Sequence, residues 1–174
     1  MRSLIALALA LMLQAQKPPD GIGLGYDGEL RHVSRQLLEL AEALPEEKYS
    51  WRPAEGVRSF GEVYVHVILG NFFLLNETGI APPKELRGVD LTKRAGSKAE
   101  MVKWLRTWLE AVKSERAKST PESRLRQVQF LNKQVDTNVD GIYLRVLVHL
   151  NEHMGQLIAY ARMNGVKPPW SAKE

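Results

Sequence analysis

The sequence predicts an all-α protein built as a four-helix bundle. Three observations support this fold class. Four stretches place apolar residues as a helix would, three along one face and one nearly all round. Two of those stretches open with a capping signature, and no internal repeat or low-complexity segment interrupts the 174 residues. A chain of this length buries a sizeable core as one ordinary domain, so we expect a single domain over residues 17–174.

The first 16 residues, MRSLIALALALMLQAQ, have the composition of a secretory signal peptide. Arg2 precedes an apolar run from Leu4 to Leu13, and small residues follow around Ala15. This run is much shorter than the roughly 20 residues that span a bilayer, and no later run is long and uninterrupted enough. We therefore expect cleavage after Ala15 or Gln16 and an exported protein, periplasmic or extracellular, with no stable membrane insertion. The alternative is a buried N-terminal helix or an uncleaved membrane anchor.

The first helix is predicted within residues 25–44, and Pro45 ends it. The second is predicted over 59–78, where Ser59 and Glu62 have the spacing of a capping box and Gly79 stops the helix. Apolar residues surround nearly all of the second helix, which predicts an interior position. The apolar face of the first helix consists of Leu30, Val33, Leu37, Leu40, Ala41 and Leu44, and the apolar residues of the second are Val63, Tyr64, Val67, Ile68, Phe72, Phe73, Leu74 and Leu75.

The third helix is predicted to open at Ser97 and Glu100, which repeat the capping signature. The last helix is predicted from near Asn138 to Asn164, because Gly165 suits a C-terminal cap and the prolines after it cannot extend a helix. The linkers near 45–58, 80–96 and 117–137 exceed the tight turns of simple bundles, so we expect at least one crossover connection. The apolar stripe of the third helix is Met101, Trp104, Leu105, Trp108 and Val112.

Between the third and fourth helices the sequence lacks a helical period. Residues Gln127–Phe130 and Lys133–Asp136 are predicted to pair as a short hairpin around Leu131 and Asn132.

The amino-acid composition limits the possible nucleophiles, metal ligands and binding partners. There is no cysteine, so the chain has neither a disulfide nor a thiolate nucleophile, and any metal site must use nitrogen and oxygen ligands. Against 20 acidic residues stand 24 basic ones, of which only Arg2 falls in the leader, so the mature chain has a net charge near +3. The basic residues alternate with acids, as in KSERAKSTPESRLR, and form no stripe with interleaved aromatic residues. We therefore expect no nucleic-acid binding.

Three of the four histidines point to a metal site. His149 and His153 are one helical turn apart on the apolar face of the last helix, where a buried imidazole needs a partner. His66 lies in the buried second helix, and Gly70, one turn later, leaves space beside its ring. Three nitrogen ligands on two helices match an open zinc site with a position for water. The alternative is three core histidines bonded to carbonyls or to one another, while His32 is predicted to lie on the surface.

The segment from His149 to His153 also spells H-x-x-E-H, a pattern found in one class of zinc peptidases. That arrangement needs a carboxylate ligand well downstream, and the only acidic residue after His153 is Glu174, at the chain end. A peptidase is therefore not expected, and Glu152 is read as an ordinary helix-surface residue or one that supports a ligand.

Four further residues have two readings each. Gln156 and Tyr160 either orient a metal-bound water or substrate, or bond locally and fill the core. Arg52 either recognises an anion or lies in solvent beside a Trp51 that packs over the bundle end. Glu62 is the nearest carboxylate along the second helix, but its capping role competes with proton transfer, so no catalytic residue is assigned.

The segments EALPEEKYSWRPAEGVRSFGEVYVHV and HLNEHMGQLIAYARMNGVKPP resemble the DinB/YfiT-like family over roughly Leu30 to Pro169. The resemblance combines the W-R-P linker, the R-S-x-G-E helix start followed by a histidine, and the H-x-x-x-H helix that ends in G-Q-L and N-G. It implies an up-down-down-up bundle that holds a divalent metal ion through His66, His149 and His153, and often a homodimer. The family that the sequence resembles includes thiol-dependent transferases and metal-dependent hydrolases, while many members have no assigned reaction.

Together these observations predict an exported metal-binding protein with an unknown small-molecule substrate. The ion is expected to be zinc, with nickel or iron as alternatives, because three imidazoles accept each of them. Export removes the protein from cytosolic thiol cosubstrates, so a metal-dependent hydrolase is favoured over a thiol-dependent transferase. The alternative is a non-catalytic bundle that binds metal or a small ligand as a dimer.

Overall fold

The computed structural model describes residues 21–131 and 133–173. The expected signal peptide at residues 1–16 lies outside the described residues, as does the start of the expected domain at residue 17. The chain divides into two compact units, Met1–His32 and Val33–Glu174, at a point within helix α2 (Gly25–Ala43). The two units are therefore described separately, and the expectation of one domain over 17–174 stays a prediction.

In the N-terminal unit, the described residues form the first turns of α2. The Gly23 amide donates to Glu29 Oε1 over 2.8 Å, and the Leu24 amide donates to the Gly21 carbonyl. These bonds give partners to two amides that directly precede the helix. His32, predicted on the surface, is partly buried.

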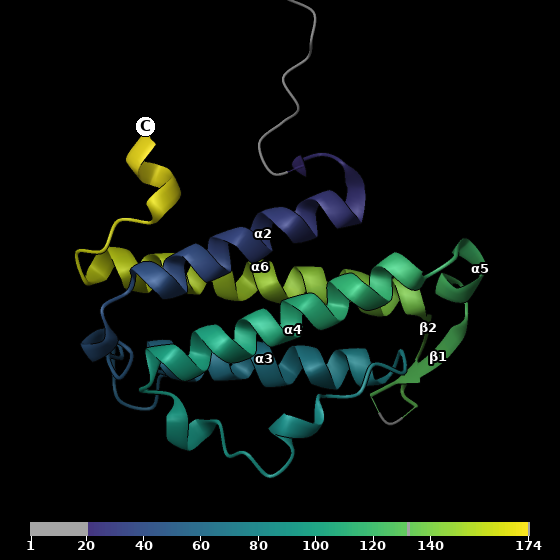
Figure 1. Cartoon of the computed structure of the whole chain (residues 1–174), viewed down its shortest axis with the longest axis horizontal. Coiled ribbons are helices and arrows are strands. Elements are labelled where there is room, and N and C mark those ends of the chain that lie inside the picture. The colour runs from purple at the N-terminus through teal and green to yellow at the C-terminus, as the bar shows by residue number, and fades with distance from the viewer. Residues whose placement is uncertain (1–20, 132, 174) are drawn as a thin grey trace, which may run out of the picture. The chain divides into compact units, whose positions relative to one another are not determined.

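In the C-terminal unit, the end of α2 joins α3 (Phe60–Asn76), α4 (Lys98–Lys118) and α6 (Val139–Met163) in a four-helix bundle. Figure 1 shows that the chain runs in one direction along α3 and α4 and in the opposite direction along α2 and α6. The all-α, up-down-down-up prediction is confirmed. Because α3 and α4 run the same way, the connection between them must return along the bundle, and it contains the short 3₁₀ helices η3 (Lys84–Leu86) and η4 (Thr92–Arg94).

Local sequence signals set most helix ends. Ser59 and Glu62 form the predicted capping box at the start of α3. At α4 only half of the predicted box forms: Ser97 accepts from the Glu100 amide, but the Glu100 carboxylate instead binds Arg94 and the Trp104 indole. At the end of α6, Gly165 has a φ of +73°. The next amide bonds back to the Ala161 carbonyl over 2.9 Å, which closes the helix as the glycine predicts.

The core lies where the apolar stripes meet, and the predicted stripes of α2 and α4 are buried throughout. Tyr49 and Tyr64 donate to carbonyls of α2, which satisfies their hydroxyls inside the core. The prediction that α3 is surrounded by core is wrong on one face of the helix. Phe73 is 56% exposed and Leu69 is 40% exposed, because one face of α3 is left uncovered.

The predicted hairpin exists, but its second strand begins two residues later than expected. Strand β1 (Gln127–Phe130) pairs antiparallel with β2 (Val135–Asn138), with Phe130 opposite Val135. Leu131 and Lys133 both adopt positive φ, so the chain uses a longer turn than two residues. The short helix α5 (Pro121–Arg124) was not predicted, since a single turn has no measurable period.

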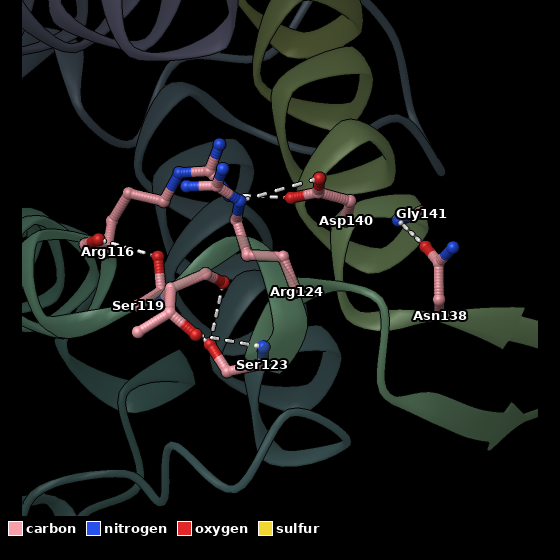
Figure 2. Close-up of polar contacts among 8 residues, drawn as sticks. Arg116, Ser119, Ser123, Arg124, Asn138, Asp140 and Gly141 are labelled. Atoms are coloured by element: carbon pink, nitrogen blue, oxygen red, sulfur yellow. Dashed lines mark hydrogen bonds and ion pairs between the residues drawn. The ribbon is translucent and has the colours of Figure 1, made fainter.

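Asp140, in the first turn of α6, links three helices. It accepts from Arg116 of α4 over 2.7 Å and forms an ion pair with Arg124 of α5 at 3.7 Å (Figure 2). Asn138 caps the same helix by accepting from the Gly141 amide. These contacts fix where α6 begins relative to α4. Within 21–131 and 133–173, no helix combines the length and apolar character that a membrane crossing requires.

Candidate metal centre

The three predicted ligands come together between α3 and α6. One ligand nitrogen from each of His66, His149 and His153 lies within 4.8 Å of the other two. The closest contact joins His66 Nε2 to His149 Nε2 over 3.1 Å. His149 is buried, whereas His66 and His153 are partly exposed. The structure therefore places all three residues in one group, as the sequence predicts.

Gly70 allows α3 and α6 to approach at this point. A Cβ atom added at Gly70 would lie 2.9 Å from His149 Cε1, closer than real Cβ contacts allow. The predicted space beside a histidine therefore exists, but it accommodates His149 of the facing helix rather than His66 of its own helix.

Two amide side chains orient the histidines of α6. The Nδ1 of His149 lies 2.9 Å from Oδ1 of the fully buried Asn71, and the Nδ1 of His153 lies 2.9 Å from Gln156 Oε1. An amide oxygen only accepts, so each Nδ1 carries the hydrogen and each Nε2 keeps its lone pair. Gln156 is held in turn by its bond to the Tyr160 hydroxyl. Such support of metal-binding histidines fixes both the tautomer and the ring orientation.

The surroundings also keep two of the imidazoles neutral. Burial lowers the pKa of His149 to about 4, and the neighbouring His153 and His66 act in the same direction. Burial, followed by the Arg58 charge and His153, lowers the pKa of His66. A metal ion binds the neutral ring, so His66 and His149 are in their ligand form at neutral pH.

The donor set fits a divalent ion. Two nitrogens that each lie about 2.05 Å from one zinc ion are about 2.9–3.4 Å apart at coordination angles between 90° and 109°. The observed 3.1 Å between the Nε2 atoms of His66 and His149 lies within this range. The residues that would hold the ion are therefore His66, His149 and His153.

The glutamate of the H-x-x-E-H pattern takes no part in this group. Glu152 is exposed and pairs through both oxygens with Arg145. Glu174 lies outside the described residues. The arrangement thus gives no support to a peptidase, in agreement with the sequence argument.

For the other residues with two possible roles, the structure mostly shows packing or local bonding rather than a role at the metal site. Trp51 packs edge-on against Tyr160, with ring centroids 5.4 Å apart. Gln156 donates to the Tyr160 hydroxyl one turn away on the same helix. It also contacts His153, one of the three histidines. Arg52 is exposed, as expected, but it also binds Glu62 over 3.0 Å.

Sequence reasoning missed Asn71. It is a polar residue in an otherwise apolar stretch of α3, and that contrast was the available signal. Its partner, His149, lies 78 positions away, so the spacing alone did not reveal the contact.

A cleft of about 450 Å³ lies beside His66, whereas His149 and His153 do not line it. His66 lines it together with apolar side chains and the charged residues Arg52, Arg58 and Glu62. A cleft beside the ligands is typical of an open site rather than of a sealed structural one.

The fold and the site together define a helical-bundle protein with a three-histidine group suited to a divalent metal ion. The model of the DinB superfamily matches residues 29–157, and the chain belongs to that superfamily. This confirms the family resemblance read from the sequence.

Two solved structures have a similar fold. A DinB-like protein from Bacillus cereus ATCC 10987 is 20% identical, with a TM-score of 0.64 over 82% of this chain and 95% of that one. A DinB-like protein (YjoA) from Bacillus subtilis is 21% identical, with a TM-score of 0.61 over 79% of this chain and 92% of that one. No curated protein matches the sequence.

Proposed function

We propose that the protein binds one divalent metal ion through His66, His149 and His153 and acts as a metal-dependent hydrolase on a small molecule. The observation that carries this proposal is the convergence of three imidazoles, one of which, His66, lines a cleft. Hydrolysis is favoured over thiol-dependent transfer because the proposed export separates the protein from cytosolic thiols.

Zinc is the proposed ion, with nickel or iron as alternatives, because the ligands are imidazoles without a thiolate or a carboxylate. When bound in an open site, such an ion lowers the pKa of water and polarises a carbonyl oxygen. The chain's own residues would supply ligand orientation, through Asn71 and Gln156, and the shaped cleft.

The contacts of Glu62 disfavour it as the general base. One oxygen accepts from the Ser59 amide and the other binds Arg52. The Ser59 bond, more than Arg52, lowers the pKa of this carboxyl. A carboxylate held in this way is a weak base, so its role is to cap α3 and to position Arg52.

A second candidate function is a non-catalytic, metal-binding homodimer. The observation that favours it is a set of exposed apolar side chains on α3 and α6, the helices that carry the histidines. Size-exclusion chromatography with light scattering distinguishes a monomer from a dimer. A dimer that dissociates on Phe73→Ser while retaining metal would support this candidate. The side chains are Leu69, Phe73, Leu144 and Val148.

Elemental analysis of untagged protein, purified without chelator, tests the metal site directly. We expect about one divalent ion per chain, lost in a triple His66→Ala, His149→Ala, His153→Ala variant and kept in His32→Ala. Equal metal content in all variants would defeat the assignment. With metal established, ester, amide and thiol-transfer substrates separate a hydrolase from a transferase.

Export is proposed on the composition of residues 1–16 alone. N-terminal sequencing of protein recovered from the periplasm or the medium tests it. We expect the mature chain to begin at Gln16 or Lys17. An intact N-terminus on protein confined to the cytoplasm would contradict export and restore the thiol-dependent alternative.

A further inference from the structure

The cleft beside His66 has an unbalanced charge. Its lining includes two arginines, Arg52 and Arg58, and one carboxylate, Glu62. Glu62 neutralises Arg52, whose guanidinium also donates to the Val57 carbonyl over 2.9 Å. These contacts therefore hold the Arg52 guanidinium against the wall of the cleft.

Arg58 differs from Arg52 in the ion pairs and hydrogen bonds of its guanidinium. Across residues 21–131 and 133–173, no carboxylate pairs with its guanidinium and no carbonyl accepts from it. The side chain is exposed on the cleft, one residue before the Ser59 cap of α3. A guanidinium offers a planar, two-pronged set of donors that matches a carboxylate.

The remainder of the cleft is partly apolar. Val57, Val65 and Leu69 contribute to its lining, and Leu69 is 40% exposed. A ligand that fills this space would bury hydrocarbon against these side chains, and Arg58 would meet its charged end.

We propose that the cleft is the substrate site and that Arg58 binds the carboxylate of a small organic anion with an apolar body. The inference rests on the proposed function in one respect only, namely that the other end of the ligand faces the metal held by His66. A divalent ion at the histidines would add to the positive charge of the cleft and strengthen the preference for an anion.

Hexanoate and hexanamide are matched probes, because they share an apolar chain and differ in charge. Calorimetric titration into the metal-loaded and metal-free full-length protein gives the affinity of each, and metal content is measured on the same samples. The variants are Arg58→Gln and, as control, Arg87→Gln, which removes an equal charge from an exposed arginine that does not line the cleft.

We expect hexanoate to bind more tightly than hexanamide, Arg58→Gln to weaken hexanoate binding by about tenfold, and Arg87→Gln to change it by less than about twofold. Equal affinity for both probes, or hexanoate binding unchanged in Arg58→Gln, would overturn the proposal, as would binding of inorganic phosphate without binding of hexanoate. Because metal content is read separately, a protein that binds hexanoate through Arg58 but holds no metal would refute the proposed function and leave the anion site standing.

Discussion

The Nε2 atoms of His66 and His149 lie 3.1 Å apart, although the two residues are 83 positions apart in the chain. In His149 the bond from Nδ1 to Asn71 leaves a lone pair on this atom. A neutral His66 that carries its hydrogen on Nε2 donates to this lone pair, and a divalent cation could take the place of that hydrogen. The contact is therefore compatible with a divalent metal ion, and each of the following predictions acts on this group or on the helices that hold it.

Gly70→Ala should weaken metal binding without unfolding the protein. The new methyl group would meet His149 Cε1 at 2.9 Å, so the ring must turn away from its ligand position. We expect the dissociation constant for zinc to rise by about tenfold or more, as for other disturbances of ligand orientation. Competition with a chelating dye measures it.

The matched control for that change is Gly155→Ala in α6, where nothing lies within 4 Å of the added Cβ. Alanine favours a helix over glycine by about 1 kcal/mol, so this variant should be slightly more stable and bind metal normally. Similar metal affinities in the two variants would show that the close approach at Gly70 does not matter.

Asn71→Ala should reduce metal affinity by about 10- to 100-fold, the usual effect of removing a group that orients a histidine ligand. The His149 Nδ1–H would lose its buried acceptor. Asn151→Ala is the control, because Asn151 is exposed on α6 and donates to the Leu147 carbonyl of its own helix. If both variants bind zinc like the wild type, the tautomer of His149 is not set by Asn71.

The metal-free protein should lose stability as the pH falls from about 6.5 toward about 4. The pKa of His149 is about 4 in the folded state, chiefly through burial. In this window the unfolded chain binds a proton at His149 that the folded chain does not, so protonation favours unfolding. Above about 6.5 this contribution to stability is complete. Urea denaturation at several pH values measures the effect.

The variant that checks this assignment is His149→Leu, which cannot titrate at this position. Its free energy of unfolding should fall less between pH 6.5 and pH 4 than that of the wild type. Parallel curves for the two proteins would mean that other groups account for the acid sensitivity.

Asp140→Asn should destabilise the fold by about 1–2 kcal/mol, because Arg116 is only 12% exposed and would keep its charge without this partner. Glu152→Gln breaks a pair with Arg145, which is 40% exposed, and should cost less than about 0.5 kcal/mol. Urea denaturation compares the two variants. A loss for Glu152→Gln as large as that for Asp140→Asn would contradict the role of Asp140 at the start of α6.

Much of this protein follows from local sequence. The period of the apolar residues, the Ser59 cap and Gly165 predict helices that the structure confirms, because helical spacing and capping involve residues only a few positions apart. The pairing of His149 with His153 on one face follows from the same geometry. The sequence by itself therefore determined the bundle and placed two of the three histidines as neighbours.

Tertiary structure decided which residues of different helices meet at the candidate site. Whether His66 meets the other two histidines, whether Asn71 reaches His149, and which face of α3 leaves Phe73 exposed all depend on how α3 packs against the rest of the bundle. Such contacts join residues brought together by packing, and helical period describes a helix only relative to its own axis, so it cannot specify which residues of another helix will face it.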